Sequence, residues 1–270
     1  MEKSDIERIA NSVRTNLQAE GVPTDLDLIL KTEGIARIPG DFNGEFDGRI
    51  EYRPNHREHR FFILHARSNR AGQNEGRVRF SIAHELGHYF LPAHREFLVN
   101  GNLHGSVNGF VSERRTEREA DYFATCLLMP RGPFMEIVNG YPGEFLTLAN
   151  LVELASGRFK ASITSTVLRY VELSVEPCCA ILSKSGLVLF SIQSYDFQAK
   201  KLGWLPRGQE LSTKTMAGNR ARLGRSNDTQ EGQSCSTEWF GGERRERMWE
   251  ESLSLGSNGL AITLLSLAQE

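Results

Sequence analysis

Two histidines and a glutamate occur together in the run His84-Glu85-Leu86-Gly87-His88. Residues four positions apart on an α-helix lie on one face, so His84 and His88 can present two imidazole nitrogens to a single ion. Zinc binds imidazole nitrogen readily, and a catalytic zinc site has three protein ligands and an open fourth position. Glu85 lies beside this face and can accept a proton from an attacking water. The run therefore predicts a hydrolytic zinc site that needs one more ligand.

The residues around this run favour a partly buried helix over a surface helix with two solvated histidines. Most of them are apolar, namely Phe80, Ile82, Ala83, Leu86 and Phe90. Polar groups enclosed by such neighbours need hydrogen-bond or metal partners. The alternative of solvated histidines fits this surrounding poorly.

A second apolar-periodic run at 113–129 offers carboxylates for the third ligand. Glu117 and Asp121 lie four residues apart and therefore on one helix face. Histidines that bind metal usually donate their other ring N–H to an acceptor, which Asp121 can supply. We assign Glu117 to the metal and Asp121 to one of the histidines, with Glu119 as the second choice of ligand. The remaining alternative is that these acids only solvate a helix face.

The first half of the chain alternates helical and strand patterns. Apolar residues at helical spacing predict an opening amphipathic helix, and they are Ile6, Ile9, Ala10, Val13 and Leu17. Short β-rich runs bounded by turn residues predict a small antiparallel sheet from 35–39, 46–53 and 60–65. The zinc-site run lies in a helix predicted at 78–91, which Pro92 ends. We interpret the polar connection 93–111 as a loop.

The second half changes from helices to strands. Helical patterns at 145–155 and 162–173 flank a short turn, and β-patterns follow at 179–182, 187–192 and 260–265. The segment 218–236 is nearly free of apolar residues, which predicts a long mobile loop.

Composition narrows the classes of function. The 270 residues carry a net charge of −2, without the basic excess that nucleic-acid binding requires. The four cysteines form no C-x-x-C pair, so we expect reduced thiols. The opening residues lack the apolar core of a signal peptide, and no stretch approaches the roughly 20 apolar residues of a membrane span. We expect a cytoplasmic protein with no membrane partner.

Two stretches closely resemble the ImmA/IrrE-type metallopeptidases: RFSIAHELGHYFL at 79–91 and EREADYFATCLLMP at 117–130. The resemblance extends over about residues 1–175. It implies that His84, His88 and Glu117 bind the metal and that Glu85 is the catalytic base. Asp121 stands where many members have asparagine, a change that keeps the hydrogen-bond acceptor.

We expect an α+β fold in three parts. The resemblance implies a gluzincin-like helical peptidase core with the small antiparallel sheet at 1–145 and helix-turn-helix-like helices at 146–175. The residue pattern beyond them predicts a C-terminal α/β domain for sensing or docking at 176–270. A structural extension without a ligand is the alternative for the last part.

Four residues are candidates for the hydrogen-bond donor that stabilises the oxyanion, namely Arg79, Tyr89, His94 and His104. The sequence does not choose among them. We interpret His94 and His104 as solvated loop residues.

The resemblance also implies a function. Members of the family cleave helix-turn-helix repressors and so relieve repression, for example after DNA damage. We therefore expect a zinc-dependent endopeptidase with such a repressor as substrate, and manganese is the alternative ion. One alternative is a non-proteolytic anti-repressor that sequesters its partner. Another is a DNA-binding regulator using 146–175, which the sparse basic residues there disfavour.

Overall fold

The chain forms two compact units in a computed structural model. The structure describes residues 1–42, 46–67, 75–101, 104–106, 115–141, 146–223, 229–256 and 258–267, with the backbone alone at 104–106 and 223. One unit comprises Met1–Ile137 and Glu153–Ser162, and the other comprises Val138–Val152 and Ile163–Glu270. The first unit contains all of the residues expected to act in catalysis.

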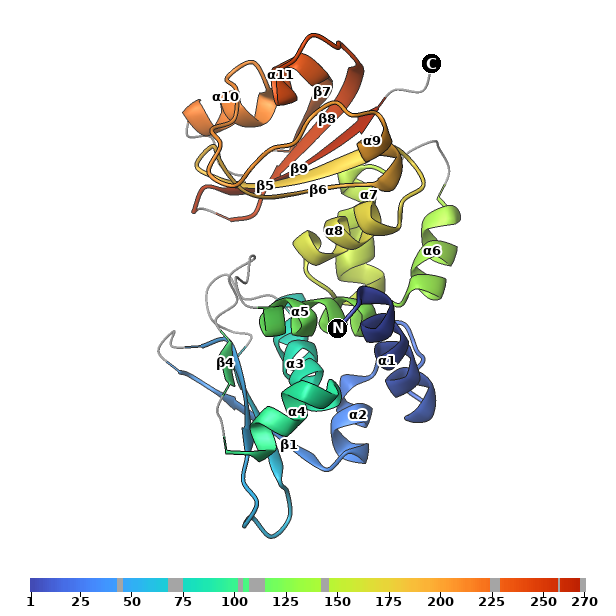
Figure 1. Cartoon of the computed structure of the whole chain (residues 1–270), viewed down its shortest axis with the longest axis vertical. Helices are drawn as coiled ribbons and strands as arrows, with labels where there is room; N and C mark the ends of the chain where they lie inside the picture. The colour runs from blue at the N-terminus through green and yellow to red at the C-terminus, as the bar shows by residue number, and fades with distance from the viewer. Residues whose placement is uncertain are drawn as a thin grey trace. The chain divides into compact units, whose positions relative to one another are not determined.

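Helices and a small sheet build the first unit (Figure 1). The helices are α1 (Lys3–Asn16), α2 (Leu26–Thr32), α3 (Glu75–Phe90), α4 (Pro92–Val99), α5 (Arg115–Leu128) and most of α6 (Arg131–Asn139). The strands are β1 (Ile35–Gly40), β2 (Gly48–Tyr52), β3 (Phe61–Ala66) and β4 (His104–Ser106). The predicted opening helix and the three predicted strands are confirmed. The short helix α2 was not predicted.

The sheet of the first unit has the strand order β1-β3-β2-β4. Strand β3 is antiparallel to β2, and β4 is antiparallel to β2 on its other side. Strand β3 lies between β1 and β2, and it runs parallel to β1. The sheet is therefore mixed at this one pairing and antiparallel elsewhere, within the α+β class that the sequence predicts.

Helix α3 is the central element of the first unit. It lies beside α5 (Figure 1), and it also contacts β2 and β3. These neighbours bury its residues all round, including Ile82, Leu86 and Tyr89. The predicted helix at 78–91 is confirmed, as is the helix predicted at 113–129 over its described residues. The predicted loop at 93–111 is wrong at its start, because Pro92 opens α4 at a position where proline needs no hydrogen-bonding N–H.

The helical segment that follows does not lie in one unit. It comprises α7 (Leu148–Glu153), the π-helical η1 (Leu154–Phe159) and α8 (Ile163–Leu173). By its contacts, the region at 153–162 belongs with the first unit and α8 with the second. The segment predicted as a separate part at 146–175 is thus divided between the units. Residue 145, where its first helix was predicted to begin, lies outside the described residues.

A five-stranded antiparallel sheet of order β6-β5-β9-β8-β7 forms the second unit. The strands are β5 (Cys178–Lys184), β6 (Leu187–Gln193), β7 (Gln230–Cys235), β8 (Arg247–Ser254) and β9 (Leu260–Leu267). The short helices are α9 (Tyr195–Ala199), α10 (Met216–Leu223) and α11 (Ser236–Phe240). A buried apolar cluster includes Ile181, Trp239 and Leu265. The three strands predicted here are confirmed.

The long mobile loop predicted at 218–236 is wrong over the residues that the structure describes there. Helix α10 extends into this segment, and β7 occupies Gln230–Cys235. Strand β7 lies at the edge of the sheet and alternates between exposed and partly buried residues. An edge strand gains its order from main-chain pairing, here with β8, and therefore needs few apolar side chains.

The neighbouring cysteines of β5 are buried thiols. Cys178 and Cys179 are both fully buried, and neither is in a disulfide. Burial raises the pKa of Cys178 to about 12 and raises that of Cys179 well above its usual value. Thiolate is the reactive form, so these groups are poorly suited to sensing oxidants.

Across the described residues, no helix is both long and apolar enough to cross a membrane.

Candidate metal centre

Close packing of two helices brings the predicted site residues together. A Cβ added to Gly87 on α3 would lie 3.1 Å from Ala120 Cα and 3.2 Å from the Ala120 carbonyl oxygen on α5. The missing side chain therefore lets the two helix backbones approach each other. Glu117 lies almost one turn before Ala120 on α5, and His84 and His88 lie on α3. The contact thus sets the carboxylate against the two imidazoles.

Three ligand atoms converge at this contact. His84 Nε2 lies 3.1 Å from His88 Nε2. Glu117 Oε2 lies 3.3 Å from His84 Nε2, and Glu117 Oε1 lies 3.6 Å from His88 Nε2. These three residues form a group whose ligand atoms all lie within 4.8 Å of one another. A tetrahedral zinc ion holds its nitrogen and oxygen ligands about 3.3 Å apart, so the separations fit zinc.

The first histidine of the pair is oriented by Asp121. His84 Nδ1 lies 2.8 Å from Asp121 Oδ1, the contact that the sequence predicts for this carboxylate. An ionised carboxylate only accepts, so Nδ1 carries the proton and donates it. The lone pair of His84 Nε2 is then available on the side of His88 and Glu117.

The charges around His84 favour a cation. Burial alone lowers the pKa of His84, but hydrogen bonds to Asp121 and Glu117 and the charge of Glu85 together raise it to about 10. The side chain of Glu117 is 17% exposed, whereas His84 is almost fully buried. A group of acceptors that stabilises a proton on a buried imidazole also stabilises a metal cation, which then competes with that proton.

The predicted base lies in the same interior. Glu85 is fully buried, and its charge acts on His84. A Cβ added to Gly48 on β2 would lie 2.9 Å from Glu85 Oε1 and 3.3 Å from Glu85 Cγ. Glycine at this position of β2 therefore makes room for the carboxylate. No prediction from the sequence included Gly48, although a glycine within a strand pattern is itself a signal of close approach.

His94 is buried, contrary to its interpretation as a solvated loop residue. It lies on α4 with 2% of its surface exposed, and its Nδ1 is 3.1 Å from His88 Nδ1. Its Nε2 is 3.1 Å from Oε2 of Glu119, the second-choice ligand. Glu119 is also paired with Arg115 and with the Met1 amino group. Glu119 therefore contacts the ring nitrogen of His94 that faces away from His88. The carboxylate that joins His84 and His88 in the candidate metal site is that of Glu117. No spacing in the sequence marks His94, because Pro92 begins a new helix between it and His88.

Two further oxyanion candidates already have other partners. Tyr89 donates to Glu33 Oε2 at 2.8 Å and accepts from Arg95 at 3.2 Å. Arg79 donates to the Thr24 carbonyl oxygen at 2.6 Å. The side chain of His104, the remaining candidate, lies outside the described residues.

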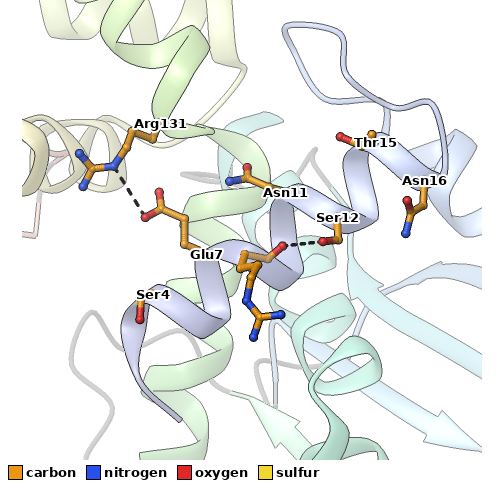
Figure 2. A pocket seen from close by; sticks show the side chains of 8 residues that line it. Ser4, Glu7, Asn11, Ser12, Thr15, Asn16 and Arg131 are labelled. Carbon is orange, nitrogen blue, oxygen red and sulfur yellow. Dashed lines mark hydrogen bonds and ion pairs between the residues drawn. The ribbon is translucent and has the colours of Figure 1, made fainter.

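A separate open hollow lies along α1. It has a volume of about 520 Å³ and a polar lining that reaches Arg131 on α6 (Figure 2). Within it, Arg131 Nε lies 3.8 Å from Glu7 Oε2. The lining includes no residue of the His84, His88 and Glu117 group. This hollow is therefore distinct from the candidate metal centre.

The helix-turn-helix-like segment has three basic residues, of which Arg158 is exposed. Arg169 on α8 is fully buried, and it pairs with Glu172 at 3.1 Å. Lys160, which precedes α8, lies 3.6 Å from Glu75. These two cations of the segment thus have acidic partners within the protein.

Comparisons with known proteins agree with this site. Residues 50–154 match the family model described as IrrE N-terminal-like domain, Peptidase_M78. Among solved structures, a Mycobacterium tuberculosis transcriptional regulator is similar with a TM-score of 0.60 and 14% identity, over 97% of this chain and 88% of that one. At this identity the likeness concerns the fold. No curated protein matches the sequence. The matched segment contains α3 and α5 with the candidate metal centre, and the match indicates peptidase chemistry. Residues 50–154 of this chain are thus similar to the IrrE N-terminal-like family of peptidases, in agreement with the resemblance of the motifs at 79–91 and 117–130.

Proposed function

We propose that this protein is a zinc-dependent endopeptidase that cleaves a helix-turn-helix repressor. The observation that carries the proposal is the convergence of His84 Nε2, His88 Nε2 and the Glu117 carboxylate, with one oxygen near each histidine, at separations that suit a tetrahedral metal. These three residues would hold the ion. Imidazole and carboxylate ligands suit zinc, with manganese as the alternative.

Glu85 is the group that makes a hydrolytic role preferable to a structural one. When bound, zinc supplies Lewis acidity that makes water more acidic and polarises a carbonyl group. Glu85, buried next to His84, accepts the proton from the attacking water and passes it to the leaving amine. A site that served structure alone needs no such base, which weighs against the non-proteolytic anti-repressor.

Two observations support a repressor as the substrate. The motifs at 79–91 and 117–130 resemble peptidases that cut repressors, and the similar solved chain is named a transcriptional regulator. A DNA-reading role is disfavoured because Arg169, the basic residue of α8, is buried and paired. Basic side chains that bind phosphate must be exposed.

Metal content and cleavage, measured together, test the proposal. Wild type, Glu117→Ala and Glu85→Gln are purified, their metal is measured by mass spectrometry, and a helix-turn-helix repressor encoded beside the gene is the substrate. We expect Glu117→Ala to lose zinc. Glu85→Gln should keep it while cleavage falls by about 10²–10⁴-fold, as expected for removal of a general base.

Three results would contradict parts of this proposal. A wild-type protein without metal argues against the whole of it. Glu85→Gln that relieves repression as fully as wild type indicates sequestration. Cleavage of other peptides with the repressor left intact removes the substrate class and leaves the peptidase.

A further inference from the structure

The two ring nitrogens of His88 have different neighbours. Its Nε2 lies on the metal side, 3.1 Å from His84 Nε2 and 3.6 Å from Glu117 Oε1. Its Nδ1 lies 3.1 Å from Nδ1 of His94 on α4. The rings of His88 and His94 are 5.1 Å apart between centroids and inclined by 35°. His94 therefore contacts the nitrogen of His88 that cannot reach the metal.

Glu119 determines which nitrogen of His94 can accept. Glu119 Oε2 lies 3.1 Å from His94 Nε2, and an ionised carboxylate accepts without donating. In a neutral His94 the proton is therefore on Nε2, and Nδ1 has a lone pair. That lone pair accepts the Nδ1–H of His88, which leaves the Nε2 lone pair of His88 for the metal. Each proton position in this chain of contacts follows from the one before it.

We propose that His94 is a positioning residue that holds His88 in its metal-binding tautomer and orientation, with Glu119 as its anchor. This inference rests on the proposed metal site. It gives the two ligating histidines different supports: Asp121 acts directly on His84, while Glu119 acts on His88 through an intervening imidazole. Groups of this kind orient the ligand and make it a better electron donor.

A matched pair of substitutions separates positioning from packing. In His94→Asn, the side-chain oxygen takes the place of imidazole Nδ1 and still accepts from His88. His94→Leu fills a similar volume without an acceptor. A residue needed only for packing would tolerate leucine better than the smaller asparagine, whereas the proposal requires the reverse order.

The readouts are zinc affinity, from competition with a chromophoric chelator, and the absorption spectrum of the cobalt-loaded protein. We expect His94→Leu to weaken zinc binding by about 10- to 100-fold and to change the cobalt bands. His94→Asn should stay close to wild type in both. Glu119→Leu should resemble His94→Leu, while Glu119→Gln, which keeps an oxygen for His94 Nε2, should bind zinc more tightly than Glu119→Leu.

His65→Leu is the control for loss of a buried histidine. His65 is 2% exposed, like His94, but it contacts Arg37 and the Ala66 carbonyl oxygen. Its variant should bind zinc as wild type does. Circular dichroism verifies folding of every variant, and the Glu119 pair decides the question if His94→Leu does not fold.

The inference and the proposed function fail in different ways. Zinc that is absent from wild type overturns the proposed metal centre, and the inference with it. Zinc that is lost in Glu117→Ala but bound equally by the leucine and asparagine variants of His94 overturns the inference alone. A second zinc ion that disappears in His94→Leu makes His94 a ligand and also overturns the positioning role.

Discussion

At the scale of single residues, the candidate site depends on a side chain that is absent. Gly48 faces Glu85 at a distance where a Cβ would lie 2.9 Å from the carboxylate oxygen. If Glu85 is the base, strand β2 therefore needs a glycine at position 48 to leave room for its carboxylate. The histidines depend in the same way on groups behind them, Asp121 for His84 and His94 for His88.

We expect Gly48→Ala to displace the Glu85 carboxylate and to leave the metal ligands in place. A misplacement of about 1 Å in a catalytic group can lower the rate roughly 10²-fold. Cleavage should therefore fall by about that factor while zinc content and zinc affinity stay as in wild type. Full activity in the alanine variant would show that Glu85 adopts its working position elsewhere.

Glu251 on β8 makes the folding stability of the protein depend on pH. This residue is far in the sequence from the residues of the candidate metal site. Burial raises the pKa of Glu251 from 4.5 to about 7, opposed by a hydrogen bond from the Leu148 amide and assisted by the charge of Glu231. A carboxyl whose pKa is higher in the folded chain binds its proton more tightly there. Its stabilising contribution is complete below pH 4.5 and is lost as the pH rises through about 7.

Glu251→Gln should remove this loss, because glutamine carries no charge and its oxygen can still accept from Leu148. Between pH 4.5 and 8, wild type should lose on the order of 1–2 kcal/mol of unfolding free energy relative to the variant. Urea unfolding at pH 5 and pH 8 measures the difference. Glu243→Gln, at an exposed position of the same unit, should follow wild type at both pH values. Parallel pH dependence in wild type and Glu251→Gln would contradict the expectation.

At the scale of elements, the separation of α3 and α5 determines the metal geometry. The absence of a side chain at Gly87 allows this separation, since a Cβ there would lie 3.1 Å from Ala120 Cα and the neighbouring backbone would have to shift. The histidines are on one helix and the carboxylate is on the other. A shift between the helices therefore changes the distances between the ligand atoms.

Gly87→Ala should consequently weaken zinc binding, by about 10-fold or more as for other disturbances of ligand orientation. Its effect on stability is partly offset, because alanine favours the helix by up to about 1 kcal/mol over glycine. Chelator competition measures the affinity. Gly132→Ala on α6 is the matched control, since nothing lies within 4 Å of its added Cβ. Equal zinc affinity in Gly87→Ala and Gly132→Ala would sink the role assigned to the α3–α5 contact.

At the scale of the whole molecule, the metal centre lies entirely in one of two compact units. The three tryptophans, Trp204, Trp239 and Trp249, all lie in the other unit. Tryptophan emission therefore reports on the unit without the metal centre, and helical circular dichroism reports on both. This distribution makes the two units distinguishable during unfolding.

Removing the metal should destabilise the first unit preferentially. A ligand present at about 1,000 times its dissociation constant stabilises the folded form by roughly 4 kcal/mol, and chelation removes that contribution. We expect the helix-detected unfolding midpoint to fall on chelation, with a smaller shift in the tryptophan-detected midpoint. Equal shifts in both signals would mean that the units unfold as one.

The sequence by itself determined the ligand group of the candidate site and most elements of the first unit. Helical spacing placed His84 and His88 on one face and paired Glu117 with Asp121, because helix periodicity depends only on neighbours along the chain. The same local signals predicted β1, β2 and β3. These predictions required no knowledge of which segments meet.

Tertiary structure alone decided the features that depend on distant segments. His94 reaches His88 because α4 begins at Pro92, and Glu119 meets His94 from 25 residues away. Gly48 and Glu85 meet only when β2 lies against α3. The polar strand β7 forms because β8 offers it main-chain partners, which its own side chains do not indicate. Such contacts are selected by packing between elements, and local residue patterns carry little of that information.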